Sequence, residues 1–222
     1  MTPSPNFGAR RGGVRPSLIV IHYTAMDSHE AARARLCDPA AEVSAHWLIS
    51  RQGAAEALVD EAQRAWHAGA GEWAGVADVN SQSIGIELDN RGDHPFAEPQ
   101  MAALEQLLGG IMARWSIPPQ RVIGHSDMAP DRKSDPGPRF DWRRLAHQGL
   151  SVWPEPAGAG RAPDFAPLAR RFGYPASDEA TLLRAFRWRF RPFATGPVTA
   201  TDAAMAADLA TRFGVDAPFA QA

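Results

Sequence analysis

Short apolar runs and helical spacings alternate over the first two thirds of the chain, which predicts an α/β fold. Residues 17–23 (SLIVIHY) form a continuous, largely β-branched run, as in a central strand that is buried on both faces. In residues 83–88 the apolar side chains alternate with Gly85 and Glu87, so the acid points to the opposite face. Further strands are predicted over 43–49, 56–59 and 122–124, and helices over 28–36, 99–115 and 141–147. We therefore expect a mixed central β-sheet flanked by helices, in a domain of residues 1–153.

The composition changes after Trp153. Residues 154–163 are rich in Pro, Gly and Ala, which is typical of a linker. Beyond this linker, helices are predicted over 165–172, 178–190 and 201–213, so residues 164–222 form a small three-helix domain. The first and third of these helices end at Gly173 and Gly214, and each glycine suits a left-handed C-terminal cap.

Composition and charge narrow the class of protein. The chain has 222 residues, of which 45% are hydrophobic and 22% charged, as in soluble globular proteins. A formal net charge of −2 gives no electrostatic case for binding nucleic acid. The single cysteine, Cys37, excludes an internal disulfide and a thiolate-rich metal site, and we expect it to be a small buried apolar residue.

The apolar run near the start, residues 18–21, is too short for a membrane span or the core of a signal peptide. The sequence as given therefore predicts a cytoplasmic protein. The alternative, the periplasm or cell envelope, applies if a leader is missing from the given sequence. We expect a monomer.

Two histidines end apolar strands, and they are the strongest candidates for chemistry. His22 and His125 lie at the carboxyl ends of their predicted strands, where open α/β sheets place their ligands. Together with Asp135 they offer two imidazoles and one carboxylate, which suits tetrahedral zinc with an open fourth position. The alternative is two histidines with satisfied hydrogen bonds at strand ends and an aspartate that caps a turn.

Two more ionisable residues have both a functional and a structural interpretation. Glu87 is either a general base or the partner of an arginine in a buried ion pair. Lys133 either polarises a carbonyl group or is a solvated loop lysine. The loop that carries Trp66 and His67 is predicted to line a cleft, because aromatic rings favour the faces of sugars and peptides.

Four motifs, in order along the chain, resemble those of a known family. They are residues 22–25 (HYTA), 65–69 (AWHAG), 83–88 (SIGIEL) and 125–138 (HSDMAPDRKSDPGP). With them the chain resembles the zinc N-acetylmuramoyl-L-alanine amidases of the amidase-2 family, most closely the AmiD-like branch with a C-terminal peptidoglycan-binding domain. The resemblance runs from about residue 10 to about residue 153, with a looser match over the tail.

This resemblance implies the amidase-2 or peptidoglycan-recognition-like fold, with zinc bound by His22, His125 and Asp135. It also implies Glu87 as catalytic base and Lys133 as the residue that stabilises the oxyanion. In the animal recognition proteins and phage amidases of this fold the third ligand is commonly cysteine, whereas here it is aspartate, as in the bacterial recycling branch. The expected substrate contacts are Trp66, His67 and Asn90.

The implied reaction is hydrolysis of the amide bond between N-acetylmuramic acid and the L-alanine of the peptidoglycan stem peptide. The substrate is either polymeric wall or soluble muropeptide fragments. The resemblance implies that the tail binds peptidoglycan, and the alternative is a purely structural helical cap. If residues 164–222 bind the wall, a chain that ends near Pro154 is expected to keep its activity on small muropeptides. The rival function is a non-catalytic peptidoglycan-recognition protein on the same fold. Such a protein typically lacks a metal ligand or the base, and all five positions are filled here.

Overall fold

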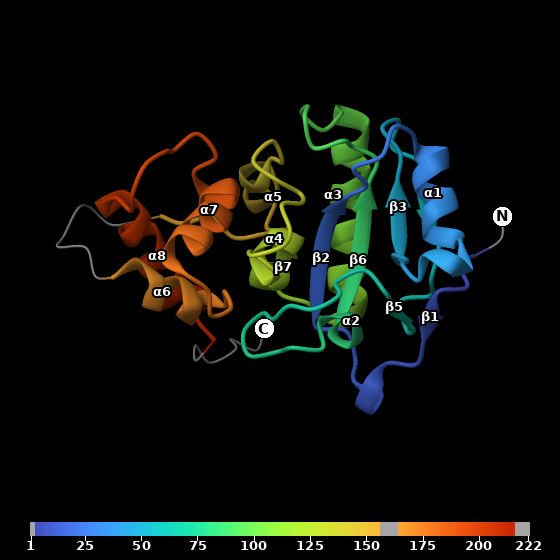
Figure 1. Ribbon diagram of the computed structural model, residues 1–222, viewed down its shortest axis with the longest axis horizontal. Coiled ribbons are helices and arrows are strands. Elements are labelled where there is room, and N and C mark those ends of the chain that lie inside the picture. The colour runs from blue at the N-terminus through green and yellow to red at the C-terminus, as the bar shows by residue number, and fades with distance from the viewer. Residues whose placement is uncertain (1–2, 156–163, 216–222) are drawn as a thin grey trace.

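The computed structural model describes residues 3–155 and 164–215, and a five-stranded sheet lies at its centre (Figure 1). The strand order is β4-β3-β6-β2-β7, with β3, β6, β2 and β7 parallel and β4 antiparallel at one edge. These strands are β2 (Leu18–Tyr23), β3 (Trp47–Ile49), β4 (Ala55–Ala57), β6 (Ser83–Leu88) and β7 (Val122–Gly124). A separate antiparallel pair consists of β1 (Phe7–Gly8) and β5 (Arg64–Ala65).

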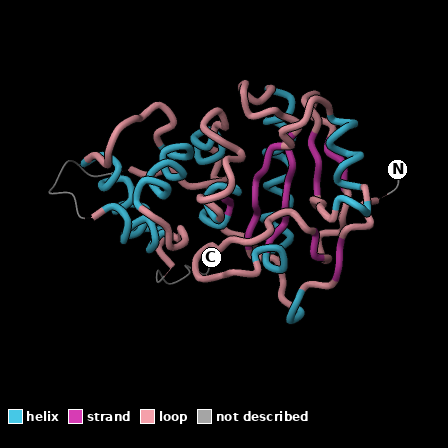
Figure 2. The backbone as a smooth tube through the Cα atoms, in the orientation of Figure 1, coloured by secondary structure: helices cyan, strands magenta, loops and turns pink. Residues whose placement is uncertain are grey.

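Helices surround this sheet, as Figure 2 shows. The α-helices are α1 (His29–Cys37), α2 (Val79–Gln82), α3 (Glu98–Trp115), α4 (His125–Met128), α5 (Trp142–His147), α6 (Phe165–Phe172), α7 (Glu179–Phe190) and α8 (Ala200–Phe213). Short 3₁₀ turns are η1 (Arg11–Gly13), η2 (Pro39–Ala41) and η3 (Pro119–Arg121). We call residues 164–215, which contain α6, α7 and α8, the C-terminal helical module. This arrangement confirms the predicted fold class.

The central strand β2 divides the core into two faces. Ile19 and Ile21 point to one face, where they pack with the apolar stripe of α3. That stripe consists of Met101, Leu104, Leu108 and Ile111, and the alternating residues Ile84, Ile86 and Leu88 of β6 face it too. Because side chains alternate along a strand, the remaining residues of β2 and β6 must face the other way.

On the second face, Leu48 of β3 packs in a small cluster with Ala32 and Leu36 of α1, whereas β2 shares its core with the C-terminal helical module. Leu18 and Val20 of β2 belong to one hydrophobic cluster with Ile123 and with aromatic residues of the C-terminal helical module. Those aromatic residues are Phe165, Phe172, Tyr174, Phe186 and Phe190. The central strand and the last three helices are therefore parts of one core.

Several local predictions can be compared with the elements observed. The predicted strand 43–49 is reduced to Trp47–Ile49, because the amide of Ser44 donates to the carbonyl of Trp66 in a loop rather than to a strand. The left-handed cap is confirmed at Gly173 (φ 142°), but it is wrong at Gly214 (φ −61°), where the chain continues extended. Most of the predicted linker, residues 156–163, lies outside the described residues.

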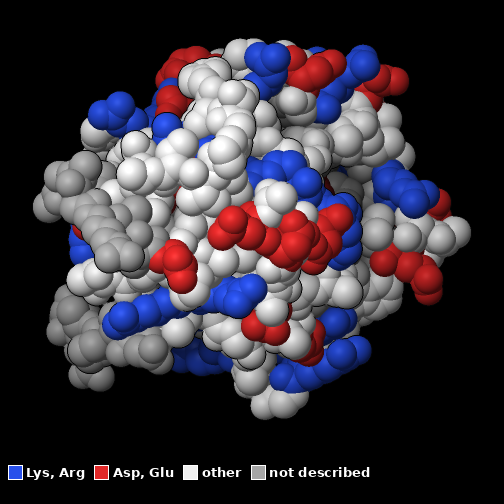
Figure 3. Space-filling view, turned by 60° about the vertical axis from the view of Figure 1, so that its left-hand side comes forward, with Lys and Arg blue, Asp and Glu red and all other residues white. Residues whose placement is uncertain are grey.

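The surface charges and the hydrophobicity of the helices agree with the expectations from the sequence. On the face shown in Figure 3, acidic and basic side chains are interspersed, in line with the net charge of −2. None of the helices in the described ranges combines the length and the hydrophobicity needed to cross a bilayer.

Candidate active site

Three neighbouring parallel strands bring the candidate residues to one edge of the sheet. His22 is the penultimate residue of β2, and Glu87 is its register partner on β6. On the other side of β2, Ile21 pairs with Gly124, and His125 follows directly at the start of α4. The order of the strands therefore places Glu87, His22 and His125 next to one another.

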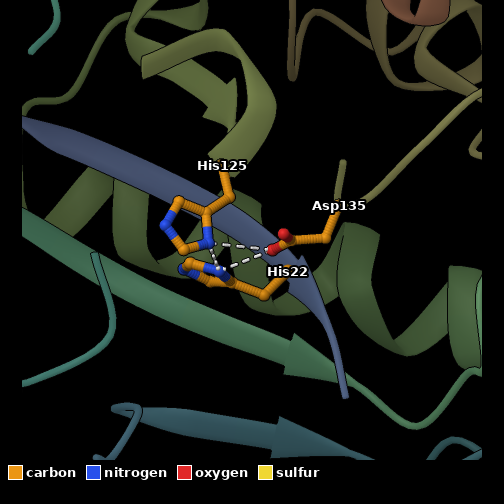
Figure 4. Close-up of side chains that lie close together, drawn as sticks. All are labelled: His22, His125 and Asp135. Carbon is orange, nitrogen blue, oxygen red and sulfur yellow. Dashed lines mark hydrogen bonds and ion pairs between the residues drawn. The ribbon is translucent and has the colours of Figure 1, made fainter. Parts of the chain in front are cut away.

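His22, His125 and Asp135 converge through three side-chain atoms (Figure 4). The Nδ1 atoms of His22 and His125 are 2.9 Å apart, and each lies 2.9–3.0 Å from Oδ2 of Asp135. All three residues are buried, with exposed fractions of 1%, 2% and 8%. Asp135 reaches this position because its own carbonyl accepts a hydrogen bond from the amide of Ser126, which ties the loop back to α4. Beyond it the chain turns through a cis Asp135–Pro136 bond and Gly137, whose φ is 73°.

The hydrogen bonds behind the two histidines determine which ring nitrogen carries the proton. His125 donates through Nε2 to the carbonyl of Ala68 at 2.9 Å, so a neutral ring has its lone pair on Nδ1. The hydroxyl of Ser83 donates to the carbonyl of Val79 at 2.5 Å and therefore accepts from Nε2 of His67 at 3.1 Å. Nδ1 of a neutral His67 then accepts from Nε2 of His22 at 3.0 Å, which leaves the lone pair of His22 on Nδ1.

This arrangement fits a metal ion. Two imidazole lone pairs and a carboxylate oxygen are all acceptors, and their mutual approach within 3.0 Å is unfavourable unless a cation lies between them. Two nitrogen ligands and one oxygen ligand are the donor set of many catalytic zinc sites. The Nε2 atoms of His125 and His22, which point away from the site, are each held by a hydrogen bond, as is usual for metal-bound histidines. Among the described residues, His22, His125 and Asp135 are the group that could hold a metal.

Gly85 makes room for the ring of His67. A Cβ atom at position 85 would lie 2.4 Å from Cγ of His67, which no side chain can tolerate. The amide of Gly85 also donates to Nδ1 of His46 at 2.9 Å, and His46 is fully buried. The glycine within β6 therefore positions a histidine that lies behind the metal site.

The ionisable groups of the site have shifted pKa values. Burial lowers the pKa of His22 to about 4, helped by the nearby His125 and opposed by Asp135. Burial alone would raise the pKa of Asp135, but the adjacent imidazoles of His125 and His22 outweigh it and hold that pKa well below its usual range. The two shifts favour a neutral His22 beside an ionised Asp135, which are the forms in which these groups bind a metal.

The pKa of Glu87 is raised, whereas that of Asp135 is lowered. Burial raises its pKa to about 8, with a further rise from Asp135 and a reduction from Lys133. Its Oε2 atom is buried and makes no hydrogen bond to any described residue. A raised pKa contradicts the interpretation as an arginine-paired carboxylate, because such a partner would lower the pKa. A buried carboxyl with a raised pKa at a cleft is characteristic of acid–base catalysts.

A cleft of about 350 Å³ opens over these groups. Its lining residues include His22, Glu87, His125, Lys133 and Asp135, so the structure brings all five predicted residues to one cavity. Tyr23, Met26, Arg35 and Trp66 also line it.

The three predicted substrate contacts have different positions. Trp66 lines the cleft, half-buried. His67 also borders it, but both ring nitrogens are engaged by His22 and Ser83, so only its ring edge or face is left for a ligand. Asn90 is not among the cleft-lining residues; it is fully buried and its amide hydrogen-bonds within the turn that contains Gly92 and His94. Its contact with substrate stays a prediction that the cleft does not support.

Sequence reasoning missed the residues that hold the site from behind. Ser83 and Gly85 are within a predicted motif, but their roles depend on His67, which comes from a separate loop. Arg132 donates to the carbonyls of Ala68 and Ala70 and so joins that loop to the loop of Asp135. The signal that could have identified Ser83 is a buried polar residue at the start of a strand otherwise rich in apolar residues.

Comparisons with known proteins agree with this site. The family model of N-acetylmuramoyl-L-alanine amidases (Amidase_2) matches residues 12–138. N-acetylmuramoyl-L-alanine amidase AmiD of Escherichia coli is 37% identical over 91% of this chain and 85% of that protein. The 1,6-anhydro-N-acetylmuramyl-L-alanine amidase AmpD of Haemophilus influenzae is 35% identical over 64% of this chain and 86% of AmpD.

Among solved structures, the chain is similar to E. coli AmiD in complex with the substrate anhydro-N-acetylmuramic acid-L-Ala-D-γ-Glu-L-Lys. The TM-score is 0.83 at 34% identity, with 94% of this chain and 93% of that chain covered. The similarity to AmiD therefore extends through the C-terminal helical module, whereas the similarity to AmpD leaves about a third of this chain unmatched.

Proposed function

The chain belongs to the amidase-2 family of N-acetylmuramoyl-L-alanine amidases, and we propose that it uses zinc to hydrolyse the amide bond between N-acetylmuramic acid and the L-alanine of the stem peptide. The observation that carries the proposal is the meeting of three acceptor atoms with Glu87 and Lys133 in one cleft. His22, His125 and Asp135 would hold the zinc. When bound, zinc acidifies a water molecule and polarises the substrate carbonyl.

Glu87 is the proton carrier of this mechanism. Its carboxylate takes a proton from the attacking water and delivers it to the nitrogen of L-alanine as the C–N bond breaks. A pKa of about 8 describes the carboxyl without a neighbouring metal. With a cation at His22 and Asp135, the ionised form of Glu87 would be favoured and its pKa would be lower, so that Glu87 could accept a proton at neutral pH.

Lys133 stabilises the negative charge that develops on the carbonyl oxygen. It lines the cleft with Glu87, and its charge is close enough to lower the pKa values of both Glu87 and His22. A fixed ammonium beside a developing oxyanion supports the transition state more than the ground state. Trp66, on the wall of the same cleft, offers an apolar ring to the sugar or peptide.

The substrate class is inferred from a relative whose structure contains a bound muropeptide and from the name of another. The structure of E. coli AmiD holds an anhydro-muropeptide with three stem residues, and the name of AmpD also specifies a 1,6-anhydro sugar. We infer that soluble anhydro-muropeptides are substrates of this chain. The predicted binding of polymeric peptidoglycan by residues 164–222 stays a prediction.

The test is direct. The zinc-loaded chain is incubated with anhydro-N-acetylmuramic acid-L-Ala-D-γ-Glu-L-Lys, and release of the free tripeptide is followed by its new primary amine. We expect release that stops when zinc is removed with a chelator and returns on adding zinc. Binding of the muropeptide without release would favour the rival, a non-catalytic recognition protein.

A further inference from the structure

A buried carboxylate next to the metal site is held by the C-terminal helical module. Asp127 is two residues beyond His125, in the single turn of α4, and is 1% exposed. Its Oδ2 accepts from the amide of Gly124 at 2.8 Å, which is local, and from Nη1 of Arg189 at 2.7 Å. Its Oδ1 accepts from the hydroxyl of Tyr174 at 2.7 Å. Two of the three donors on this carboxylate therefore come from the module.

Arg189 joins several parts of the catalytic region at once. Besides Asp127, its guanidinium donates to the carbonyl of Val122 in β7 at 2.9 Å and to Oγ of Ser151 at 3.3 Å. It also lies over the ring of Trp142 in α5, 4.4 Å from the ring centroid. The side chain is 2% exposed, so both charges of the Arg189–Asp127 pair are removed from water. A pair of this kind fixes geometry, because leaving either charge without its partner is costly.

Other contacts from the module hold the loop between α4 and Asp135. Nη2 of Arg184 donates to the carbonyl of Pro130 at 3.0 Å, and the hydroxyl of Ser177 donates to Oδ1 of Asp131 at 2.5 Å. Trp73, in the loop after the AWHAG motif, packs edge-on against Phe172 and Tyr174. The module thus contacts both loops from which the metal site is built.

The turn of α4 connects these contacts to the metal ligands. His125 is its first residue, and the amide of the next residue, Ser126, donates to the carbonyl of Asp135 at 2.8 Å. A displacement of Asp127 would therefore be transmitted to two of the three proposed ligands. The third, His22, lies within the sheet and does not depend on this turn.

We propose that the C-terminal helical module is a built-in brace of the metal site, in which Arg189 and Tyr174 are positioning residues that hold Asp127 and thereby fix His125 and Asp135. This role rests on the proposed metal-dependent function and differs from wall binding, because it acts within the chain. It predicts the opposite of what wall binding predicts for a chain ending near Pro154, namely weaker zinc binding and lower activity on small muropeptides.

The same helix offers a matched control. Arg187, two residues before Arg189, forms a buried pair with Asp202 of α8, with Nη2 2.6 Å from Oδ2. Its side chain is 7% exposed and that of Asp202 is fully buried. This pair lies within the module, so its loss should affect stability without reaching the metal site.

The experiment compares zinc affinity in the full chain for wild type, Arg189→Met, Tyr174→Phe and Arg187→Met, by competition with a colorimetric chelator. Melting temperatures are measured on the same preparations. Loss of a partner that orients a metal ligand commonly weakens metal binding about 10–100-fold. We expect a loss in this range for Arg189→Met, a smaller one for Tyr174→Phe, and none for Arg187→Met, although both arginine variants melt at lower temperature.

Each outcome decides a different point. If Arg189→Met does not fold, Tyr174→Phe decides, because it keeps the ring and removes only the hydroxyl that Asp127 accepts from. Wild-type zinc affinity in the folded brace variants would overturn the brace, and so would an equal loss in Arg187→Met. A wild-type chain that binds no zinc would overturn the proposed function itself. This outcome is distinguishable from failure of the brace, because it is seen in the wild type before any variant is compared.

Discussion

Glu87 and His22 are register partners on adjacent parallel strands, so their side chains lie next to each other on one face of the sheet. His22 presents Nδ1 to the metal site, whereas Glu87 has a buried oxygen that no described residue hydrogen-bonds. The pairing thus separates two roles, a ligand and a proton acceptor, at neighbouring positions of one sheet edge. Four predictions test this division and the groups that support it.

Glu87→Gln should abolish most of the activity and leave the metal in place. The amide keeps the shape of the side chain but cannot take a proton from water. We expect turnover on a muropeptide to fall by about 10²–10⁴-fold, the usual contribution of a general base. Zinc content should stay near that of the wild type. A folded, zinc-loaded variant with near-native turnover would remove Glu87 from the mechanism.

The stability of the metal-free chain should fall as the pH rises through the range set by Glu87. Its pKa is about 8 when folded and 4.5 in the reference state, so between these values the folded chain holds a proton that the unfolded chain has lost. The free energy of unfolding therefore decreases as pH rises across this window. Well above pH 6.5, the usual histidine pKa, His22, His46 and His67 are neutral in both states, because burial lowers their pKa values when folded, and they no longer oppose the trend.

Urea unfolding in the presence of a chelator checks this prediction. Between neutral pH and about pH 8 the wild type should lose stability, whereas Glu87→Gln should show a flatter dependence. Equal slopes for the two proteins would mean that another group titrates in this range.

Asp135→Ala should remove both metal and activity. It deletes the carboxylate oxygen that lies 2.9–3.0 Å from both imidazole nitrogens, which leaves two ligands for the ion. Asp135→Asn is the matched variant, since it keeps an oxygen but no charge. We expect weak zinc binding and no measurable hydrolysis for alanine, and an intermediate zinc affinity for asparagine. Stoichiometric zinc together with near-normal turnover in Asp135→Ala would show that the metal lies elsewhere.

Ser83→Ala should weaken zinc binding, although Ser83 reaches the proposed ligand His22 only through a hydrogen bond to His67. The hydroxyl holds His67 in the tautomer that accepts from His22, and without it either tautomer of His67 is allowed. We expect zinc affinity to fall by about 10-fold, at the lower end for an outer partner. Ser81→Ala is the control, because Ser81 is also buried but its hydroxyl accepts from Arg64 and from the amide of Arg11. Similar zinc affinities in Ser83→Ala and Ser81→Ala would contradict the role of the hydrogen bonds that link Ser83 through His67 to His22.

The sequence contains more information about the ligands than about their supports. His22 and His125 were predictable because each ends an apolar strand, and strand ends of a parallel sheet share one edge. Asp135 and Glu87 came within recognisable motifs. Asp127 could not be assigned a partner, because Tyr174 and Arg189 lie 47 and 62 residues further along the chain and only the packing of α7 brings them close.

The boundary of the C-terminal region shows a related limit. The helices of residues 164–215 were predictable from apolar spacing and glycine caps, and the linker-like composition before them predicted a detachable domain. Composition describes the connection, however, and not the surface that the helices cover. That surface is the face of β2 that carries Leu18 and Val20, which the sequence pattern marks only as a buried strand.

The shared core has a consequence for how the protein is made. Leu18 and Val20 are synthesised well over a hundred residues before the helices of their core cluster, which lie within residues 165–213. Contacts between such distant segments form late, because a long loop must close first, and apolar surface left open meanwhile invites aggregation. Helices α6, α7 and α8 therefore decide when the much earlier strand β2 is shielded from water.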